Sequence, residues 1–314
     1  MKIGYPCINR TVGCKGDRTF RLKSYSEERL IDTVENNLIC LLKMLEFNVR
    51  HNILFFRITS DLVPFASHPV CKFDWQSRFE RRFREIGDFI KDHDIRISMH
   101  PDQFILINSL DPGVLQRSLK ELSYHVEVLD LMELDSSAKI QFHVGGVYGD
   151  RKDSIRRFIE RFGNLSGKLR SRLVIENDDR LYRLRDCLQI SRKTGAPVVF
   201  DFFHHEANNR GETIKQSFEL FTGTWKGRDG VPLVDYSSQQ KDAPRRRHAD
   251  TIDLAHFRDF LEETKPFDYD VMLEVKDKEK SAQKAVQIAS EDPRFHVSND
   301  SNLEPCEGGD IKWE

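Results

Sequence analysis

The sequence lacks the features of membrane, secreted and polycationic proteins. Its longest apolar runs, such as 53–56, are far too short to span a bilayer. Its first residues contain no apolar stretch followed by a small-residue cleavage site, which is the pattern of a secretory signal. The formal net charge over 314 residues is only −2, which excludes a histone-like polycation but leaves room for a local basic groove. We therefore expect a cytoplasmic protein with no membrane association.

The cysteines lack the paired spacing of zinc ribbons and redox motifs. They are scattered along the chain, at Cys7, Cys14, Cys40, Cys71, Cys187 and Cys306. In a chain of this length such scattering is typical of reduced thiols, and we expect no disulfide framework. The sequence also lacks a Gly-x-Gly-x-x-Gly turn, a Walker loop and a Gly-x-Ser-x-Gly elbow. These absences argue against a dinucleotide-binding sheet, a P-loop enzyme and a serine hydrolase.

Short apolar runs alternate with longer amphipathic segments along the chain. The runs cover 2–5, 53–59, 95–99, 139–143, 172–176, 197–203, 232–236 and 270–275. The segments between them have helical periodicity and are expected to begin near Ser24, Trp75, Val114, Ser154, Leu181, Thr213, Asp253 and Ser281. Buried parallel strands read as continuous apolar runs, so this order indicates repeated strand–helix units.

Eight such units predict a single-domain α/β fold, the (β/α)8 TIM barrel, whose typical size is about 250 residues. We place this domain at residues 1–294 and the active site at the C-terminal ends of its strands. An open doubly wound sheet is the alternative architecture. Residues 295–314 are expected to form a C-terminal tail that packs loosely or is disordered.

Residues suited to metal binding follow the predicted strands at the end where such a barrel carries its active site. They are His100, His143, Glu176, Asp201, His204, Asp235, His248 and Glu274. Asp201 and His204 can reach one ion only if the strand has already turned into its loop. Imidazoles and carboxylates are ligands for Zn²⁺ and Mn²⁺. Because these candidates exceed the need of one ion, the sequence predicts a cluster of two or three.

The predicted loops on the same rim are basic. Candidate contacts to phosphates or bases are Arg10, Tyr148, Lys152 and Arg246. Gln103 and Phe104 follow His100 and place an amide beside an aromatic ring, a pair that can wedge into a base stack. Clusters of ions can hydrolyse phosphodiesters or isomerise sugars on this barrel. The basic loops favour a nucleic-acid enzyme, and a sugar isomerase or epimerase remains the alternative.

At these residues the sequence resembles the UV damage endonucleases of the UvdE/UvsE type. The matching stretches fall in the family's order, at 4–9, 57–64, 99–103, 142–149, 175–179, 199–205, 237–238, 248–250 and 273–276. The resemblance implies a (β/α)8 enzyme, related to endonuclease IV, that acts on double-stranded DNA carrying UV lesions. It implies a nick immediately 5′ of pyrimidine dimers, 6-4 photoproducts and abasic sites, leaving 3′-hydroxyl and 5′-phosphate ends. Mn²⁺ is the expected metal, with Zn²⁺ or Mg²⁺ as alternatives, and we expect a monomer.

The resemblance also assigns roles to residues. It implies that His100, His143, Glu176, Asp201, His204, His248 and Glu274 are the metal ligands. Glu176, Glu274, His100 and His143 are expected to carry catalysis, the two glutamates by bridging ions. Gln103 and Phe104 match the pair that probes the lesion from one side, and Tyr5 and Asn9 match the pair on the other strand. Phe104 often corresponds to Tyr in the family.

One segment departs from the family's pattern. Members often carry Lys-x-His on the seventh strand, whereas this chain has Leu233 and Asp235 there. Leu233 cannot be carboxylated, so a role for a modified lysine is lost. We expect Asp235 to bind a cation in place of the imidazole and to tilt the site toward Mn²⁺ or Mg²⁺.

Overall fold

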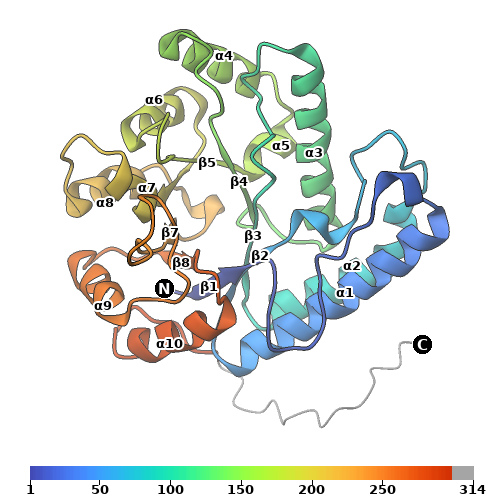
Figure 1. The fold of residues 1–314 in the computed structure, drawn as a ribbon, viewed down its shortest axis with the longest axis horizontal. Helices are drawn as coiled ribbons and strands as arrows, with labels where there is room; N and C mark the ends of the chain where they lie inside the picture. The colour runs from blue at the N-terminus through green and yellow to red at the C-terminus, as the bar shows by residue number, and fades with distance from the viewer. Residues whose placement is uncertain (299–314) are drawn as a thin grey trace.

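Eight parallel strands close into a barrel in the computed structural model, which describes residues 1–298 (Figure 1). Each strand pairs with the next in sequence, and β1 pairs with β8. The strands are β1 (Ile3–Pro6), β2 (Phe55–Ile58), β3 (Arg96–Met99), β4 (Lys139–His143), β5 (Leu173–Glu176), β6 (Val198–Asp201), β7 (Leu233–Tyr236) and β8 (Asp270–Leu273). Every predicted apolar run overlaps one strand, and the predicted TIM barrel is confirmed.

Helices surround the barrel. They are α1 (Glu27–Arg50), α2 (Trp75–Asp92), α3 (Pro112–Leu131), α4 (Arg151–Gly163), α5 (Gly167–Arg172), α6 (Leu184–Thr194), α7 (Phe202–Ala207), α8 (Ile214–Thr222), α9 (Leu254–Glu263) and α10 (Glu279–Ala289), with 3-10 turns η1 (Leu22–Ser24), η2 (Ser60–Leu62) and η3 (Gly227–Asp229). Short polar caps start several of them, because a side-chain oxygen accepts a hydrogen bond from a free backbone N–H. Thr213 and Asp253 cap α8 and α9 in this way, as the sequence predicts. None of the helices in residues 1–298 is long and apolar enough to cross a membrane.

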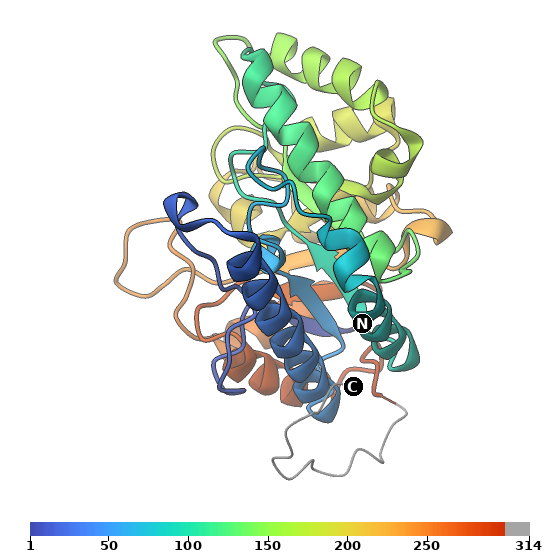
Figure 2. The ribbon, with the colours of Figure 1, turned by 90° about the vertical axis from the view of Figure 1, so that its right-hand side faces the viewer.

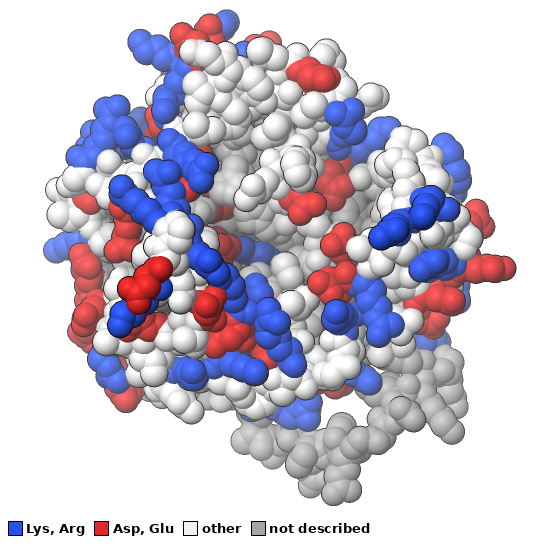
Figure 3. Space-filling model, in the orientation of Figure 1, with Lys and Arg blue, Asp and Glu red and all other residues white. Residues whose placement is uncertain are grey.

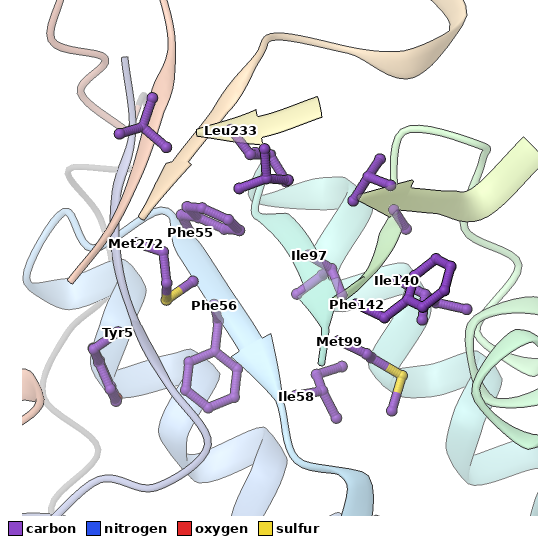
Figure 4. Close-up of a cluster of buried hydrophobic side chains, with 14 of the residues drawn as sticks. Tyr5, Phe55, Phe56, Ile58, Ile97, Met99, Ile140, Phe142, Leu233 and Met272 are labelled. Atoms are coloured by element: carbon purple, nitrogen blue, oxygen red, sulfur yellow. The ribbon is translucent and has the colours of Figure 1, made fainter. Parts of the chain in front are cut away.

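The apolar core lies on both faces of the strands. Side chains alternate between the two faces of a strand. Phe56 and Ile58 therefore lie on the face of β2 opposite to Phe55, and Figure 4 shows these three side chains within the buried cluster. Leu233 on β7 is completely buried beside Phe55 in this view. The position where the family often has lysine is thus part of an apolar layer.

The N-terminal end of the barrel is closed by buried charges. Lys139, the first residue of β4, donates from Nζ to Asp229 Oδ1 at 2.7 Å and to Ser171 O at 2.7 Å. Arg96 of β3 donates to the carbonyl oxygens of Asp229 and Val231 at 2.9 and 3.2 Å. All three charged residues are almost fully buried. They tie η3 to the strands at the end opposite to the predicted active site.

The segments that follow the strands project from the other end. Figure 2 shows the β1–α1 segment, in dark blue, and the β7–α9 segment, in orange, extending to the left. Figure 1 is viewed from this side. The C-terminal rim is therefore where the loop residues singled out in the sequence gather.

Three expectations differ from the structure or lie partly outside it. The sixth run was expected to continue as a strand to Phe203, but the chain turns at Asp201 and begins α7. Cys14 and Cys40 form a disulfide, contrary to the expectation of none, because the loop after β1 folds back on α1 across 26 residues. Of the predicted tail, residues 295–298 contact the barrel, with His296 N donating to Met1 O at 2.9 Å. The rest, 299–314, lies outside the described residues.

Candidate active site

Glu176, the last residue of β5, stands at the centre of the predicted ligand cluster. Its carboxylate is almost fully buried, and three imidazoles face it. Oε2 lies 3.2 Å from His100 Nε2 and 3.7 Å from His143 Nε2, and Oε1 lies 3.1 Å from His204 Nδ1. Burial opposes its ionisation, yet the imidazoles of His143, His100 and His204 hold the pKa of Glu176 well below its usual range. This carboxylate is therefore an anion at neutral pH.

The chain holds the His100 ring in a fixed orientation. Its Nδ1 lies 2.8 Å from Pro101 O, which fixes that nitrogen as an N–H donor. Its Nε2 lies 3.2 Å from the Glu176 carboxylate, which can only accept a hydrogen bond, so Nε2 donates to it in this structure and would have to release that proton to ligate a metal. The buried Nδ1 of His143 has no hydrogen-bond partner. The His100 ring is thus oriented as in metal sites, where the second nitrogen fixes the ring, whereas no hydrogen bond to Nδ1 fixes the ring of His143.

The turn from β6 into α7 places Asp201 and His204 together. Asp201 Oδ1 accepts a hydrogen bond from His204 N at 2.6 Å, so the aspartate caps the helix. Its other oxygen lies 3.2 Å from His204 Nδ1. The sequence predicted that both residues can reach one ion only if the chain turns directly after the strand. The chain makes this turn by starting α7 immediately after Asp201.

Glu274 and Asp235 lie on the neighbouring side of the cluster and are joined by an arginine. Arg57 Nη1 donates to Glu274 Oε1 at 2.5 Å. Arg57 Nη2 donates to both oxygens of Asp235, at 2.7 and 2.9 Å. Gln141 completes the network, because its Nε2 donates to Glu176 Oε2 at 2.7 Å and to Asp235 Oδ2 at 2.5 Å. Residues of β2, β4, β5 and β7 and the residue that follows β8 are thus linked inside the barrel.

His248 stands at the edge of this cluster. Its Nδ1 lies 3.0 Å from the backbone oxygen of Glu274 and 3.9 Å from Glu274 Oε2. It is held by an isolated antiparallel bridge to Gln239 in the loop after β7. Its ring centroid lies 6.1 Å from that of His204. The structure therefore brings all eight predicted ligand residues to one place, with His248 outermost.

The carboxylates of the cluster outnumber the nearby fixed cations. Among residues 1–298, the carboxylates of Glu176, Asp201, Asp235 and Glu274 form ion pairs with one guanidinium, that of Arg57, which pairs with Asp235 and Glu274. Burial raises the pKa of Asp201 well above its ordinary value, and the carboxylates of Glu176 and Glu274 add to the effect. Burial likewise raises the pKa of Asp235 to about 7, although Arg57 opposes the shift. A bound divalent cation would relieve this excess of negative charge.

Among the residues that the structure describes, three groups of side chains have the donor set of a metal site. They are His100, His143 and Glu176; Glu176, Asp201 and His204; and Asp201, Asp235 and Glu274, each with ligand atoms within 4.8 Å of one another. Two ligand atoms that are each about 2.0–2.2 Å from one ion can lie at most about 4.4 Å apart, so each group is nearly compact enough to share an ion. The residues present therefore fit a metal centre, and Glu176 belongs to two of the groups.

The predicted DNA-binding residues lie on the rim around this cluster, where Figure 3 shows Lys and Arg side chains along the left and lower margin of a central hollow. Gln103 is exposed, and Phe104 is 80% exposed although it is aromatic. Lys152 is exposed in the first turn of α4, and Arg10 is exposed with Nε donating to Lys276 O. The side chains of Tyr148 and Arg246 already contact other protein groups. Tyr148 packs under the guanidinium of Arg157, and Arg246 pairs with Asp179 at 3.3 Å.

Two predicted lesion-probing residues are not on this surface. Tyr5 is completely buried, and its hydroxyl donates to Asn48 Oδ1 at 2.6 Å while accepting from Asn9 Nδ2 at 2.9 Å. Asn9 Oδ1 accepts from the N–H groups of Thr11 and Val12. In this structure the pair holds the beginning of the β1–α1 loop, and neither side chain faces outward. Both polar groups are used inside the protein, so the expected contact with DNA would require these hydrogen bonds to break.

Sequence reasoning missed three residues that support the cluster. Arg57 and Gln141 are described above. His125 on α3 is completely buried, and its Nε2 lies 3.0 Å from Ser60 Oγ, which in turn donates to His100 O. The signal available for Arg57 was a charge inside an apolar strand run. For Gln141 it was a polar residue two positions before His143, on the same face of β4.

Comparison with known proteins assigns the chain to a family. The model of the family described as UV-endonuclease UvdE matches residues 1–300. The chain is 40% identical to the UV DNA damage endonuclease of Clostridium perfringens over 93% of its length and 71% of the relative's. The crystal structure of SacUVDE superimposes with a TM-score of 0.89 at 45% identity, covering 93% of this chain and 98% of that chain.

A more distant structure shares the fold alone. Endonuclease IV from Thermus thermophilus has a TM-score of 0.55 at 14% identity, covering 80% of this chain and 93% of that chain. The sugar isomerase or epimerase considered from the sequence is not supported, because the family match is to an endonuclease over nearly the whole barrel. The chain belongs to the UV-endonuclease UvdE family and is an endonuclease.

Proposed function

We propose that the protein is a metal-dependent DNA repair enzyme that nicks double-stranded DNA immediately 5′ of UV photoproducts. The substrates are cyclobutane pyrimidine dimers, 6-4 photoproducts and abasic sites, and the products carry 3′-hydroxyl and 5′-phosphate ends. The observation that carries this proposal is the convergence of three imidazoles on Glu176 beneath a rim with basic loops and an exposed Phe104. Family membership supports the substrate class, since the relatives are UV DNA damage endonucleases.

The ligands of the metal centre are proposed to be His100, His143, Glu176, Asp201, His204, His248 and Glu274. When bound, the divalent ions, with Mn²⁺ the expected metal, supply hydroxide at neutral pH and neutralise charge on the scissile phosphate. Glu176 holds the centre together because it belongs to two of the ligand groups. Pro101 O and the His100 Nδ1–H keep that imidazole in the ligating tautomer.

The rim residues bind and deform the DNA. Arg10, Lys152 and Arg246 contact backbone phosphates, which position the duplex without reading its sequence. A lesion weakens base stacking, so the duplex kinks there at lower cost and the damaged nucleotides leave the stack. Gln103 and Phe104 fill the space that they vacate. Lesion choice then depends mostly on deformability, which accounts for the tolerance of chemically different damage.

The proposal is tested by nicking of an end-labelled, UV-irradiated duplex beside an undamaged control. With Mn²⁺ we expect one cut just 5′ of each dimer, absent from the control and abolished by EDTA. The ends are checked by ligation and by phosphatase treatment. Cutting at abasic sites alone would replace the proposal with an endonuclease IV-like activity. Inactivity on both substrates with metal bound would contradict it.

Replacing Phe104 with Ala is expected to weaken binding to damaged duplex by about 10-fold, because base–aromatic stacking is worth about 1–3 kcal/mol per base. Binding to undamaged duplex should change much less, since no base leaves the stack there. Leu220→Ala removes another exposed apolar side chain, from α8, and serves as the control. Affinities from fluorescence anisotropy on both duplexes check the prediction, and an equal loss on both would contradict it. Phe104→Tyr should retain wild-type discrimination.

A further inference from the structure

Arg57 is a buried cation that competes with a metal ion for the same carboxylates. It lies in β2 and is only 3% exposed. Its guanidinium reaches across the barrel interior to Glu274, the residue after β8, and to Asp235 on β7. It also donates to Gln141 Oε1 at 3.0 Å. Five donors in a planar fork make arginine suited to binding two carboxylates at once.

Hydrogen bonds from Arg57 and Gln141 occupy most of the acceptor positions of the Asp235 carboxylate. A carboxylate offers about four acceptor positions. Arg57 Nη2 donates to both oxygens of Asp235, and Gln141 Nε2 donates to Oδ2. Glu274 differs, because its Oε1 is bound by Arg57 while its Oε2 lies free beside His248 at 3.9 Å. Glu274 can therefore ligate an ion through one oxygen, whereas Asp235 is enclosed.

The three candidate ligand groups therefore differ in how freely their side chains can bind a metal ion. In the group of Asp201, Asp235 and Glu274, two of the three members are paired with Arg57. Within residues 1–298 no Lys or Arg forms an ion pair with Glu176 or Asp201, whose partners are histidines. A guanidinium does not lose its proton in a protein, so it cannot become a neutral ligand. It repels any second cation placed beside it.

We propose that Arg57 is a fixed third cation of the centre, so that the protein binds two divalent ions through the groups that share Glu176 and none through Asp235. The proposal rests on the proposed function only in taking the cluster to bind metal. It narrows the expected two or three ions to two. It also gives Asp235 a role that is not ligation: it orients Arg57, which in turn holds Glu274.

The test counts ions in the protein without DNA. The chain is stripped with EDTA and titrated with Mn²⁺, and free Mn²⁺ is followed by its EPR signal, with metal analysis of the dialysed protein as a second count. We expect two ions for the wild type. Asp235→Asn should keep two ions, with affinities changed by less than about threefold. Three ions in the wild type, or the loss of one ion in Asp235→Asn, would overturn the proposal.

Removing the guanidinium of Arg57 should raise the number of bound ions. Arg57→Gln frees Asp235 and Glu274, so a third Mn²⁺ should appear, and Mn²⁺ should raise the melting temperature of this variant more than that of the wild type. The double variant Arg57→Gln/Asp235→Asn should return to two ions. Arg96→Gln removes a buried arginine of the neighbouring strand from the opposite end of the barrel and should leave the count at two. A folded Arg57→Gln protein that still binds two ions would contradict the assignment.

These counts are independent of cleavage. A protein that fails to nick irradiated DNA while binding two ions would contradict the proposed function and leave the role of Arg57 supported. A protein that nicks and loses an ion in Asp235→Asn would contradict the role of Arg57 alone.

Discussion

Glu176→Gln is expected to abolish nicking of UV-irradiated duplex while leaving its binding to that duplex almost unchanged. The substitution keeps the shape of the side chain but removes the negative charge that faces three imidazoles. Because Glu176 belongs to both ligand groups that carry no arginine, its neutralisation affects each of them. We expect the rate to fall by about 10³-fold or more, the scale of loss when a principal electrostatic group leaves an active site.

The measurement is single-turnover nicking with saturating Mn²⁺, combined with anisotropy to determine affinity for the same duplex. Affinity should stay within about threefold, since the phosphate-binding loops are untouched. Glu206→Gln is the matched control: it neutralises a carboxylate on α7 that is 43% exposed and faces His256 rather than the ligand cluster. The control should nick at the wild-type rate. Turnover by Glu176→Gln comparable with the wild type would remove Glu176 from its assigned role.

The barrel could be predicted because its strands are buried on both faces. Each strand then reads as a short apolar run, and a carboxylate or imidazole breaks the run where the strand reaches the rim. His143 and Glu176 are the last residues of β4 and β5, which is where the sequence placed them, and Asp201 is the last residue of β6 although its run was expected to continue to Phe203. The same argument failed beyond Asp201. Phe202 and Phe203 extend the apolar run, but they pack as the first turn of α7 because Asp201 caps that helix.

Other features depend on contacts between distant segments and leave no mark in local spacing. The disulfide requires the loop at Cys14 to fold back on α1 at Cys40. The Tyr5 side chain is buried between the barrel and α1 because its hydroxyl donates a hydrogen bond to Asn48 of α1. The partners of Arg57 are 178 and 217 residues away in sequence, so its charge was visible but its function was not. Residue types therefore predicted which side chains converge on one place, but not the network that orients them.

Lys139→Met is expected to destabilise the fold by about 3–5 kcal/mol, the cost of removing one partner from a buried ion pair. Lys139 is completely buried, and Asp229 is 3% exposed. Methionine fills a similar volume, but Asp229 Oδ1 loses the donor at 2.7 Å, and the backbone oxygen of Ser171 loses its donor too. The double variant Lys139→Met/Asp229→Asn should recover part of this loss, because no unpaired charge then remains buried.

Urea unfolding followed by circular dichroism checks these values. The control is Lys265→Met, which breaks an exposed pair with Glu262 and should cost less than about 1 kcal/mol. Lys139 lies at the N-terminal end of its strand, whereas the ligand cluster lies at the C-terminal ends, so the folded fraction of Lys139→Met should nick DNA at the wild-type rate. Stability equal to the wild type would show that the pair with Asp229 contributes nothing net. Lost activity in a folded protein would instead couple the two ends of the barrel, through the interior layer that contains Phe55 and Leu233.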